Sequence, residues 1–264
     1  MDWSQLRFGY RLGMAAVLCV WVFWDCLWQL LHNPSSSYTS SFTIGGTPAF
    51  PVFRACGGLL IIHWCWGLST LVWNRFRINY IYLFEFDPRT VNSSFTILNE
   101  AVDETLVFLI CMLLYYKSCL DSIPKPFASG WYAFALVAYT FKCLVTPWRI
   151  RKGLWVTVKS VVTAPYTEST FFGTYVADVF TSMVKVLHDW AWTFCYLLSG
   201  DFLETKHHFF KHPDRHWQAS VAYVNVLIPL LCLLPTWFRL MQCLRRYHDT
   251  GSRWPNLANA FKYR

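Results

Sequence analysis

The sequence predicts an all-α membrane protein: a polytopic bundle of about six transmembrane helices with both termini in the cytosol. Two observations carry this prediction. Of the 264 residues, 55% are hydrophobic and only 14% are charged, whereas roughly 25% of residues in soluble domains are charged. The chain also contains six separate apolar stretches, and a span needs about 20 mostly apolar residues. The 15 Trp and 14 Tyr residues suit the membrane interfaces, which favour rings with one polar edge.

The six predicted spans follow one another along the chain. They cover residues 9–31, 55–73, 95–116, 127–147, 172–199 and 217–238. The first stretch is too long for a removable signal peptide and lacks a small-residue cleavage site, so we expect it to remain as a span. The segment between the first two spans is rich in Ser, Thr, Gly and Pro, which predicts an irregular loop.

Lysine and arginine residues predict the orientation of these spans. If the N-terminus is cytosolic, the cytosolic segments hold fifteen Lys and Arg residues and the opposite side holds six. Cytosolic loops carry the excess of basic residues, so both termini are expected in the cytosol. The glycosylation sequon at Asn92 then faces the cytosol and should stay unmodified. The net charge of +8 comes from basic residues that have apolar neighbours, which favours contact with a lipid bilayer over contact with nucleic acid.

The fifth predicted span contains four polar residues at helical spacing. They are Asp178, Ser182, Lys185 and Asp189, at positions i, i+4, i+7 and i+11, so a continuous helix would place them on one face. A charged residue at the bilayer centre costs about 2.5–3.5 kcal/mol, so these groups should face protein or water. A pair of Lys185 with either aspartate would lower this cost. Two interpretations remain open, a polar seam between helices and a polar pathway or binding site.

Charged residues in the third and fourth spans have similar alternatives. Glu100, Asp103 and Glu104 fall in the first turns of the third span, where carboxylates interact favourably with the helix dipole. They are equally well placed to face a cavity and pair with arginines. Lys142, near the end of the fourth span, either extends to the interface or joins Lys185 in lining a site for an anion.

Several kinds of chemistry are not indicated. His208, His212 and His216 are four residues apart, but Pro213 interrupts a helix there, which favours a solvated loop over a metal site. The ten cysteines show no CxxC pair and several lie in apolar runs, so we expect them to be free thiols. The sequence contains no phosphate-binding Gly-rich loop, nucleophile elbow or HExxH motif. We therefore expect neither an enzyme nor a bound cofactor or metal.

A basic segment, TWFRLMQCLRRYHDT, follows the last apolar stretch. Topology alone explains its arginines as a positive cytosolic flank. Their order adds information, because Arg239, Gln242 and Arg246 are at i, i+3 and i+7 and share one helical face, whereas Arg245 points elsewhere. Arg239 and Arg246 are therefore candidates for an anion-binding mouth, and Arg245 for contact with lipid headgroups.

Four segments in chain order resemble the EXS domain. They are PVFRACGGLLIIHWCWGLSTLVWNRFRINYIYLFEFDPR, VVTAPYTESTFFGTYVADVFTSM, LPTWFRLMQCLRRYHDT and WPNLANAFKY. This domain occurs in eukaryotic phosphate exporters related to the xenotropic and polytropic retrovirus receptor, and in the yeast ER-retention-defective protein. The resemblance divides the chain into residues 1–50, with the first helix and a luminal loop, and an EXS-like transmembrane domain over residues 51–264.

The resemblance implies a protein that moves inorganic phosphate. The first span begins near residue 9, which leaves no room for the SPX domain of the exporters, so the chain is more similar to the SPX-less branch that acts in the Golgi. That branch returns phosphate released by luminal glycosylation and helps retain resident proteins. The alternative is a non-transporting adaptor in the Golgi or ER membrane that binds the machinery sorting Golgi glycosyltransferases.

The resemblance also assigns residues to the phosphate pathway. The aspartate of the family's ADQ motif falls on Asp178, where Val179 replaces the expected Gln, and the signature arginines fall on Arg239, Arg245 and Arg246. The segment with Glu85, Asp87, Pro88 and Arg89 matches in full. The family's domain continues past its NAxKY motif with further spans, so we expect this chain to be shortened at its C-terminus.

Overall fold

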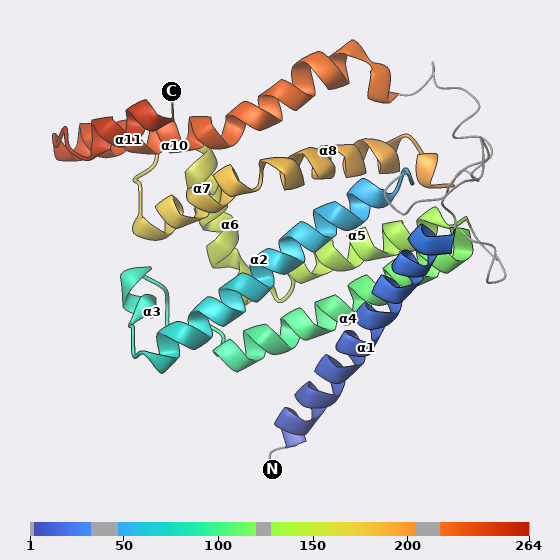
Figure 1. Ribbon diagram of the computed structural model, residues 1–264. Helices are drawn as coiled ribbons and strands as arrows, with labels where there is room; N and C mark the ends of the chain where they lie inside the picture. The colour runs from blue at the N-terminus through green and yellow to red at the C-terminus, as the bar shows by residue number, and fades with distance from the viewer. Residues whose placement is uncertain (1–2, 33–46, 120–127, 204–216, 264) are drawn as a thin grey trace. The chain divides into compact units, whose positions relative to one another are not determined.

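The computed structural model describes residues 3–32, 47–119, 128–203 and 217–263 (Figure 1). Within these ranges the chain forms helices joined by turns, with no β-strand, which confirms the predicted all-α class. The predicted loop between the first two spans lies mostly outside the described residues, as do the three histidines at positions 208, 212 and 216.

Each predicted span corresponds to helix in the structure. In chain order these helices are α1 (Trp3–His32), α2 (Phe50–Arg75), α4 (Ser94–Cys119), α5 (Gly130–Val145), α7 (Phe171–Ser182) with α8 (Val184–Leu198), and α10 (Ile228–Thr250), which follows a π-helical turn, η5 (Ala222–Leu227). Among the described residues, three helical segments are long and apolar enough to cross a membrane: Trp3–Asp25, Phe50–Arg75 and Ala222–Thr250. The shorter α5 is also apolar.

The chain divides into two compact units, and the first contains α1, α2, α4, α5 and the end of α8. Its segments are Met1–Leu71, Ser93–Phe141 and Asp189–Pro213. Helices α1 and α4 lie side by side (Figure 1) and share a core of Ala15, Val102, Leu106 and Leu109. Trp64 of α2 packs against the same core. The apolar faces of α1 and α2 therefore both pack against α4.

Helix α2 approaches α4 closely because one of its residues has no side chain. A Cβ atom on Gly67 would lie 2.8 Å from Cδ2 of Leu98. Next to this contact, Trp64 Nε1 donates a hydrogen bond of 2.9 Å to Thr105 Oγ1. Small residues that let backbones approach, combined with an interhelical hydrogen bond, are typical of packing in membranes. These contacts fix the register of α2 against α4.

The second unit contains α3 (Tyr80–Leu83), α6 (Trp148–Val162), α7, the start of α8, α10 and α11 (Asn256–Lys262). Its segments are Val72–Asn92, Lys142–His188 and Asp214–Arg264. Helix α7 packs against both α6 and α10, and α11 folds back against α10. The buried core at this junction consists of Val161, Val176 and Ala177.

The fifth predicted span is not one continuous helix, which corrects the prediction for residues 172–199. Helix α7 ends at Ser182, Met183 forms a turn, and α8 begins at Val184. The hydroxyl groups of Thr181 and Ser182 both donate to the carbonyl oxygen of Asp178, at 2.7 and 3.3 Å. Such side-chain bonds compete with the backbone for the same acceptor and bend helices. The four polar residues of this stretch therefore do not share one uninterrupted helical face.

Candidate functional site

The centre of the candidate site is Arg239, a buried arginine on α10. Only 8% of its surface is exposed, and its Nε atom lies 2.7 Å from Oδ1 of Asp178 on α7 in an ion pair. Its Nη1 donates a hydrogen bond of 3.1 Å to Oε1 of Gln242, one turn further along α10. Its guanidinium carbon lies 5.2 Å from the centre of the Tyr263 ring, and the Tyr263 hydroxyl donates to Asp178 over 3.4 Å.

The Arg239–Asp178 pair is asymmetric in its exposure. The side chain of Arg239 is 10% exposed, whereas that of Asp178 is 49% exposed. The buried Nε atom of Arg239 is close to Asp178 but makes no aligned hydrogen bond with any described residue. An anionic oxygen of Asp178 therefore already occupies this side of the guanidinium. The half-exposed aspartate is the partner that solvent or a ligand can reach.

Gln242 fastens this part of α10 to α7. Its side-chain amide Nε2 donates a hydrogen bond of 3.1 Å to the carbonyl oxygen of Gly173, and the Gln242 side chain is buried. A Cβ atom on Gly173 would lie 3.9 Å from Gln242 Nε2, which is ordinary van der Waals contact. The amide thereby holds the Arg239 guanidinium through its other end, Oε1, in a fixed orientation.

The two remaining signature arginines have different surroundings. Arg246 Nη2 donates to the carbonyl oxygen of Ser169 at 3.4 Å and to Thr174 Oγ1 at 3.3 Å, near the beginning of α7. Arg245 instead pairs with Asp249 on its own helix at 2.9 Å and donates to the carbonyl oxygen of Pro165. Arg239, Gln242 and Arg246 thus all contact α7 or the residues just before it, as their spacing suggested, whereas Arg245 forms a local pair on a partly exposed surface.

The other candidates of the fifth predicted span lie in separate surroundings. The hydroxyl of Ser182 is bonded to the backbone of Asp178, and the exposed Lys185 Nζ lies 3.0 Å from His188 Nδ1. Asp189 is 1% exposed and forms a two-pronged ion pair with Arg54 of α2, whose Nε and Nη2 donate over 2.5 and 2.6 Å. Each aspartate therefore has an arginine partner from another helix.

The carboxylates at the start of α4 also have basic partners. Asp103 forms an ion pair with Arg11 of α1, and the same guanidinium donates to Asn99. Glu104 Oε2 lies 2.9 Å from Nδ1 of His63, in the middle of α2. Asp103 therefore pairs with an arginine, whereas the partner of Glu104 is a histidine. Lys142 is exposed in the last turn of α5.

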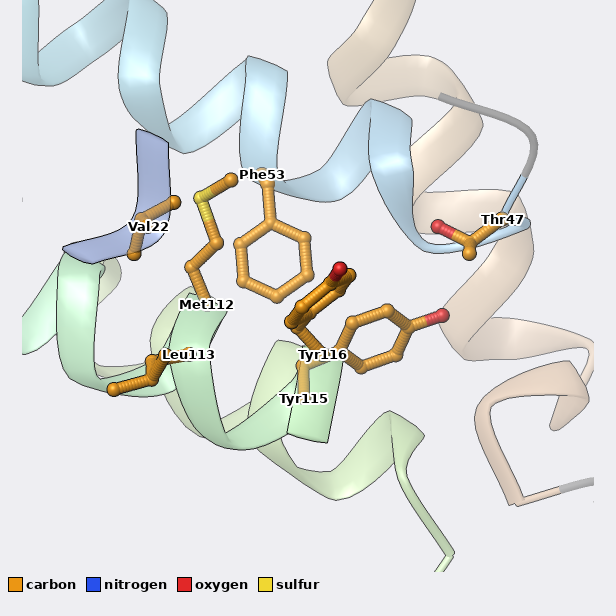
Figure 2. Close-up of a pocket in the computed structure, with 7 residues that line it drawn as sticks. All are labelled: Val22, Thr47, Phe53, Met112, Leu113, Tyr115 and Tyr116. Atoms are coloured by element: carbon orange, nitrogen blue, oxygen red, sulfur yellow. The ribbon is translucent and has the colours of Figure 1, made fainter. Parts of the chain in front are cut away.

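The structure offers no geometry for a metal ion, because no cluster of three His, Cys, Asp or Glu side chains occurs within the described ranges. A pocket in the first unit is lined by apolar and aromatic side chains of α1, α2 and α4 and by Thr47 (Figure 2). Phe53 faces Tyr115 across it, with ring centres 5.2 Å apart. A lining of this kind suits hydrocarbon rather than an anion.

Comparison with known proteins gives the family. The profile of the EXS family matches residues 49–264, which is most of the chain. This chain belongs to the EXS family. The matched region contains all the candidate site residues, including the Arg239–Asp178 pair, and begins just before α2 of the EXS domain.

Curated relatives of this EXS chain come from distant eukaryotes. SPX and EXS domain-containing protein 1 of Dictyostelium discoideum is 28% identical over 272 residues, covering 99% of the chain and 27% of the relative. The xenotropic and polytropic retrovirus receptor 1 homolog of Danio rerio is 29% identical over 270 residues, covering 99% and 37%. Human solute carrier family 53 member 1 is 25% identical over 273 residues, covering 99% and 36%. The chain thus spans between about a quarter and two fifths of the length of these relatives, and their names denote a receptor and a solute carrier rather than enzymes.

Sequence reasoning about this EXS domain missed several site residues. Tyr263 belongs to the NAxKY motif, but its contact with Asp178 was not predicted, because the two residues are 85 positions apart. Arg54 was counted only as a basic residue of one membrane side, although an arginine in the first turn of a span suggests a buried acidic partner. His63 did carry a usable signal, since it is an ionisable residue at the midpoint of an apolar helix.

Proposed function

We propose that this EXS chain moves inorganic phosphate across an internal membrane, from the lumen of the Golgi or ER to the cytosol. The observation that carries the proposal is the buried guanidinium of Arg239, whose aspartate partner is half exposed. The planar donor fork of arginine matches phosphate oxygens better than the point charge of lysine does. The resemblance to phosphate exporters suggests that the anion is inorganic phosphate.

The residues around Arg239 have distinct roles in this proposal. Gln242 and the ring of Tyr263 hold the guanidinium in place, so little ordering is required when phosphate arrives. Asp178 neutralises Arg239 while the site is empty and competes with phosphate for it. This competition keeps binding weak enough for release, which conduction through any selective site requires.

Arg246 gives the site its net positive charge. With Arg239 and Asp178 neutralising each other, Arg246 remains as a cation whose hydrogen bonds among the described residues go to neutral acceptors, Ser169 and Thr174. It lies seven residues from Arg239 along α10, or about 10 Å at the rise of an α-helix. A phosphate leaving Arg239 would therefore meet a second guanidinium on the cytosolic side, by the topology that the basic residues predict.

Phosphate flux in proteoliposomes that contain the purified chain tests this function. Wild type should release trapped phosphate faster than empty vesicles, and Arg239→Lys should lower the flux at least about tenfold, because one charge-assisted hydrogen bond contributes about 1.5–3 kcal/mol. Asp178→Asn should lower both the apparent KM and the maximal flux, since phosphate loses its competitor. Arg245→Lys is the matched control, because Arg245 pairs locally with Asp249 and should retain wild-type flux.

A flux no greater than that of empty vesicles would overturn the transport proposal for this chain. The adaptor alternative makes the opposite pair of predictions in cells. Deleting the residues after Arg239 would then displace a Golgi glycosyltransferase from its compartment while phosphate release stayed unchanged. The exposed Trp254 and Phe261 near α11 are the side chains a sorting partner would contact.

A further inference from the structure

His63 lies at the midpoint of α2, a helix of 26 residues that is long and apolar enough to cross a membrane. An ionisable side chain at this depth is costly, by about 2.5–3.5 kcal/mol for a charged residue on insertion scales, unless it has a partner. The side chain of His63 is only 13% exposed. The phosphate site around Arg239 does not involve it, so its position needs a separate explanation.

Two carboxylates of α4 flank the His63 ring. Nδ1 lies 2.9 Å from Oε2 of Glu104, and Nε2 lies 3.9 Å from Oε2 of Glu100. The two glutamates are four residues apart on α4, so they sit one turn apart on the same face. The neighbouring hydrogen bond from Trp64 to Thr105 fixes the register in which His63 meets this face.

The two ring nitrogens have different states. An ionised Glu104 can only accept a hydrogen bond, so Nδ1 of His63 carries the proton that is donated to it. Nε2 of a neutral ring then holds a lone pair, and this atom is buried with no hydrogen-bond partner among the described residues. Binding one proton at Nε2 converts the lone pair to an N–H group facing Glu100. The ring becomes an imidazolium held between two carboxylates, and the net charge of the three groups changes from −2 to −1.

We propose that His63, Glu100 and Glu104 form a proton-binding site within the membrane, through which proton uptake accompanies phosphate transport. The coupling rests on the proposed transport function, whereas the site itself does not. A proton that moves with an anion reduces the net charge carried through the bilayer. His63 is suited to this because histidine changes charge between about pH 5 and 8.

The other charged groups around the site have partners of their own. On α1, which packs against α4, Arg11 is bound to Asp103 and Asn99. On α2 itself, Arg54 is bound to Asp189 of α8. From α5, Thr140 interacts with Cys56 of α2, seven positions before His63, and both groups are neutral. Glu100 and Glu104 are therefore the carboxylates that respond to the proton.

The direct test is to follow the ring nitrogens of His63 by solid-state nuclear magnetic resonance. The full chain, with isotope-labelled histidine in lipid bilayers, is titrated from about pH 5 to 8, the range in which histidine changes charge. The His63 signals are identified by their loss in His63→Gln. We expect His63 to change protonation state reversibly, and Glu104→Gln to alter that change, because it removes the carboxylate that contacts Nδ1. His248→Gln is the matched control, since the exposed His248 pairs with Asp249 and should leave the His63 signals unchanged.

A second arm measures phosphate flux with and without an imposed pH gradient. Wild-type flux should respond to the gradient, and His63→Gln should lose the response while a basal flux remains. A single protonation state of His63 throughout the titration, or a titration that neither Glu104→Gln nor Glu100→Gln alters, would overturn the proton site. A titrating His63 with flux indifferent to the gradient would overturn the coupling alone. Absence of flux in every variant would count against the transport function and leave the nitrogen titration as the test of the site.

Discussion

At the scale of single residues, the ion pair of Arg54 with Asp189 predicts an uneven response to mutation. Asp189 is 1% exposed and Arg54 is 40% exposed. Arg54→Ala leaves a buried carboxylate without its cation, which should lower the free energy of unfolding by about 3 kcal/mol. Asp189→Asn leaves an arginine that water can reach and an amide that still accepts a hydrogen bond, so its cost should be about 1 kcal/mol.

Thermal unfolding of the purified variants in detergent micelles measures this difference. The double variant Arg54→Met with Asp189→Leu is the informative control, because replacing a buried ion pair by apolar side chains is often neutral or stabilising. It should unfold at a higher temperature than Arg54→Ala alone. Equal losses for Arg54→Ala and Asp189→Asn would contradict the assignment of Asp189 as the desolvated partner.

How far individual site residues could be predicted depended on the distance along the chain to their partners. The contact of Arg239 with Gln242 followed from their i, i+3 spacing, because both lie on one helix. The partner of Arg239 did not, since Asp178 lies on a different helix and periodicity carries no information on how helices pair. Asp178 became a candidate only through its position in a motif that resembles the EXS family. The partner of His63 was not predicted either, because Glu104 lies on another helix, 41 residues away.

At the scale of helices, the beginning of α5 is fixed by a contact that allows no side chain. A Cβ atom on Gly130 would lie 2.0 Å from the carbonyl oxygen of Phe202, which follows α8. This neighbour is backbone and cannot rotate away, and the Phe202 ring is stacked on Phe134 with centres 5.5 Å apart. Gly130→Ala should therefore destabilise the chain by at least about 1–3 kcal/mol, the usual cost of overpacking.

Gly153 provides the matched control for this prediction. It lies within α6, is exposed, and a Cβ atom there would meet nothing within 4 Å. Gly153→Ala should stabilise the helix by up to about 1 kcal/mol, the difference in helix propensity. The two substitutions are chemically identical, so opposite shifts of the unfolding temperature would follow from their surroundings alone. A shift of the same sign for both would contradict the close approach of α5 to Phe202.

Helix existence was predictable at this scale, whereas helix continuity was not. Long apolar stretches fixed the positions of α1, α2, α4 and α10, because burial in lipid requires about 20 such residues whatever the partners. The break between α7 and α8 depends instead on the hydroxyls of Thr181 and Ser182 turning back to Asp178. The same hydroxyls could equally have pointed to solvent, and the residue pattern does not distinguish the two.

At the scale of the whole molecule, the topology decides which side of the membrane each site faces. The excess of fifteen basic residues over six predicts that the start of α4 and both termini lie in the cytosol. The sequon at Asn92 precedes α4 and would then be out of reach of the luminal glycosylation enzymes. A glycosylation acceptor introduced by Ser129→Asn with Trp131→Thr lies before α5, on the predicted luminal side.

Expression in cells with and without an enzyme that removes N-linked glycans measures this arrangement. The native chain should show no change in electrophoretic mobility, because Asn92 is cytosolic, whereas the chain with the acceptor at residue 129 should show one. Epitope tags at both termini should be digested by protease added to sealed microsomes. Modification of Asn92, or protection of either tag, would contradict the predicted orientation. In the opposite orientation the start of α4 lies in the lumen. Arg246 would then lie on the luminal side of Arg239, and phosphate would meet the two guanidinium groups in the opposite order.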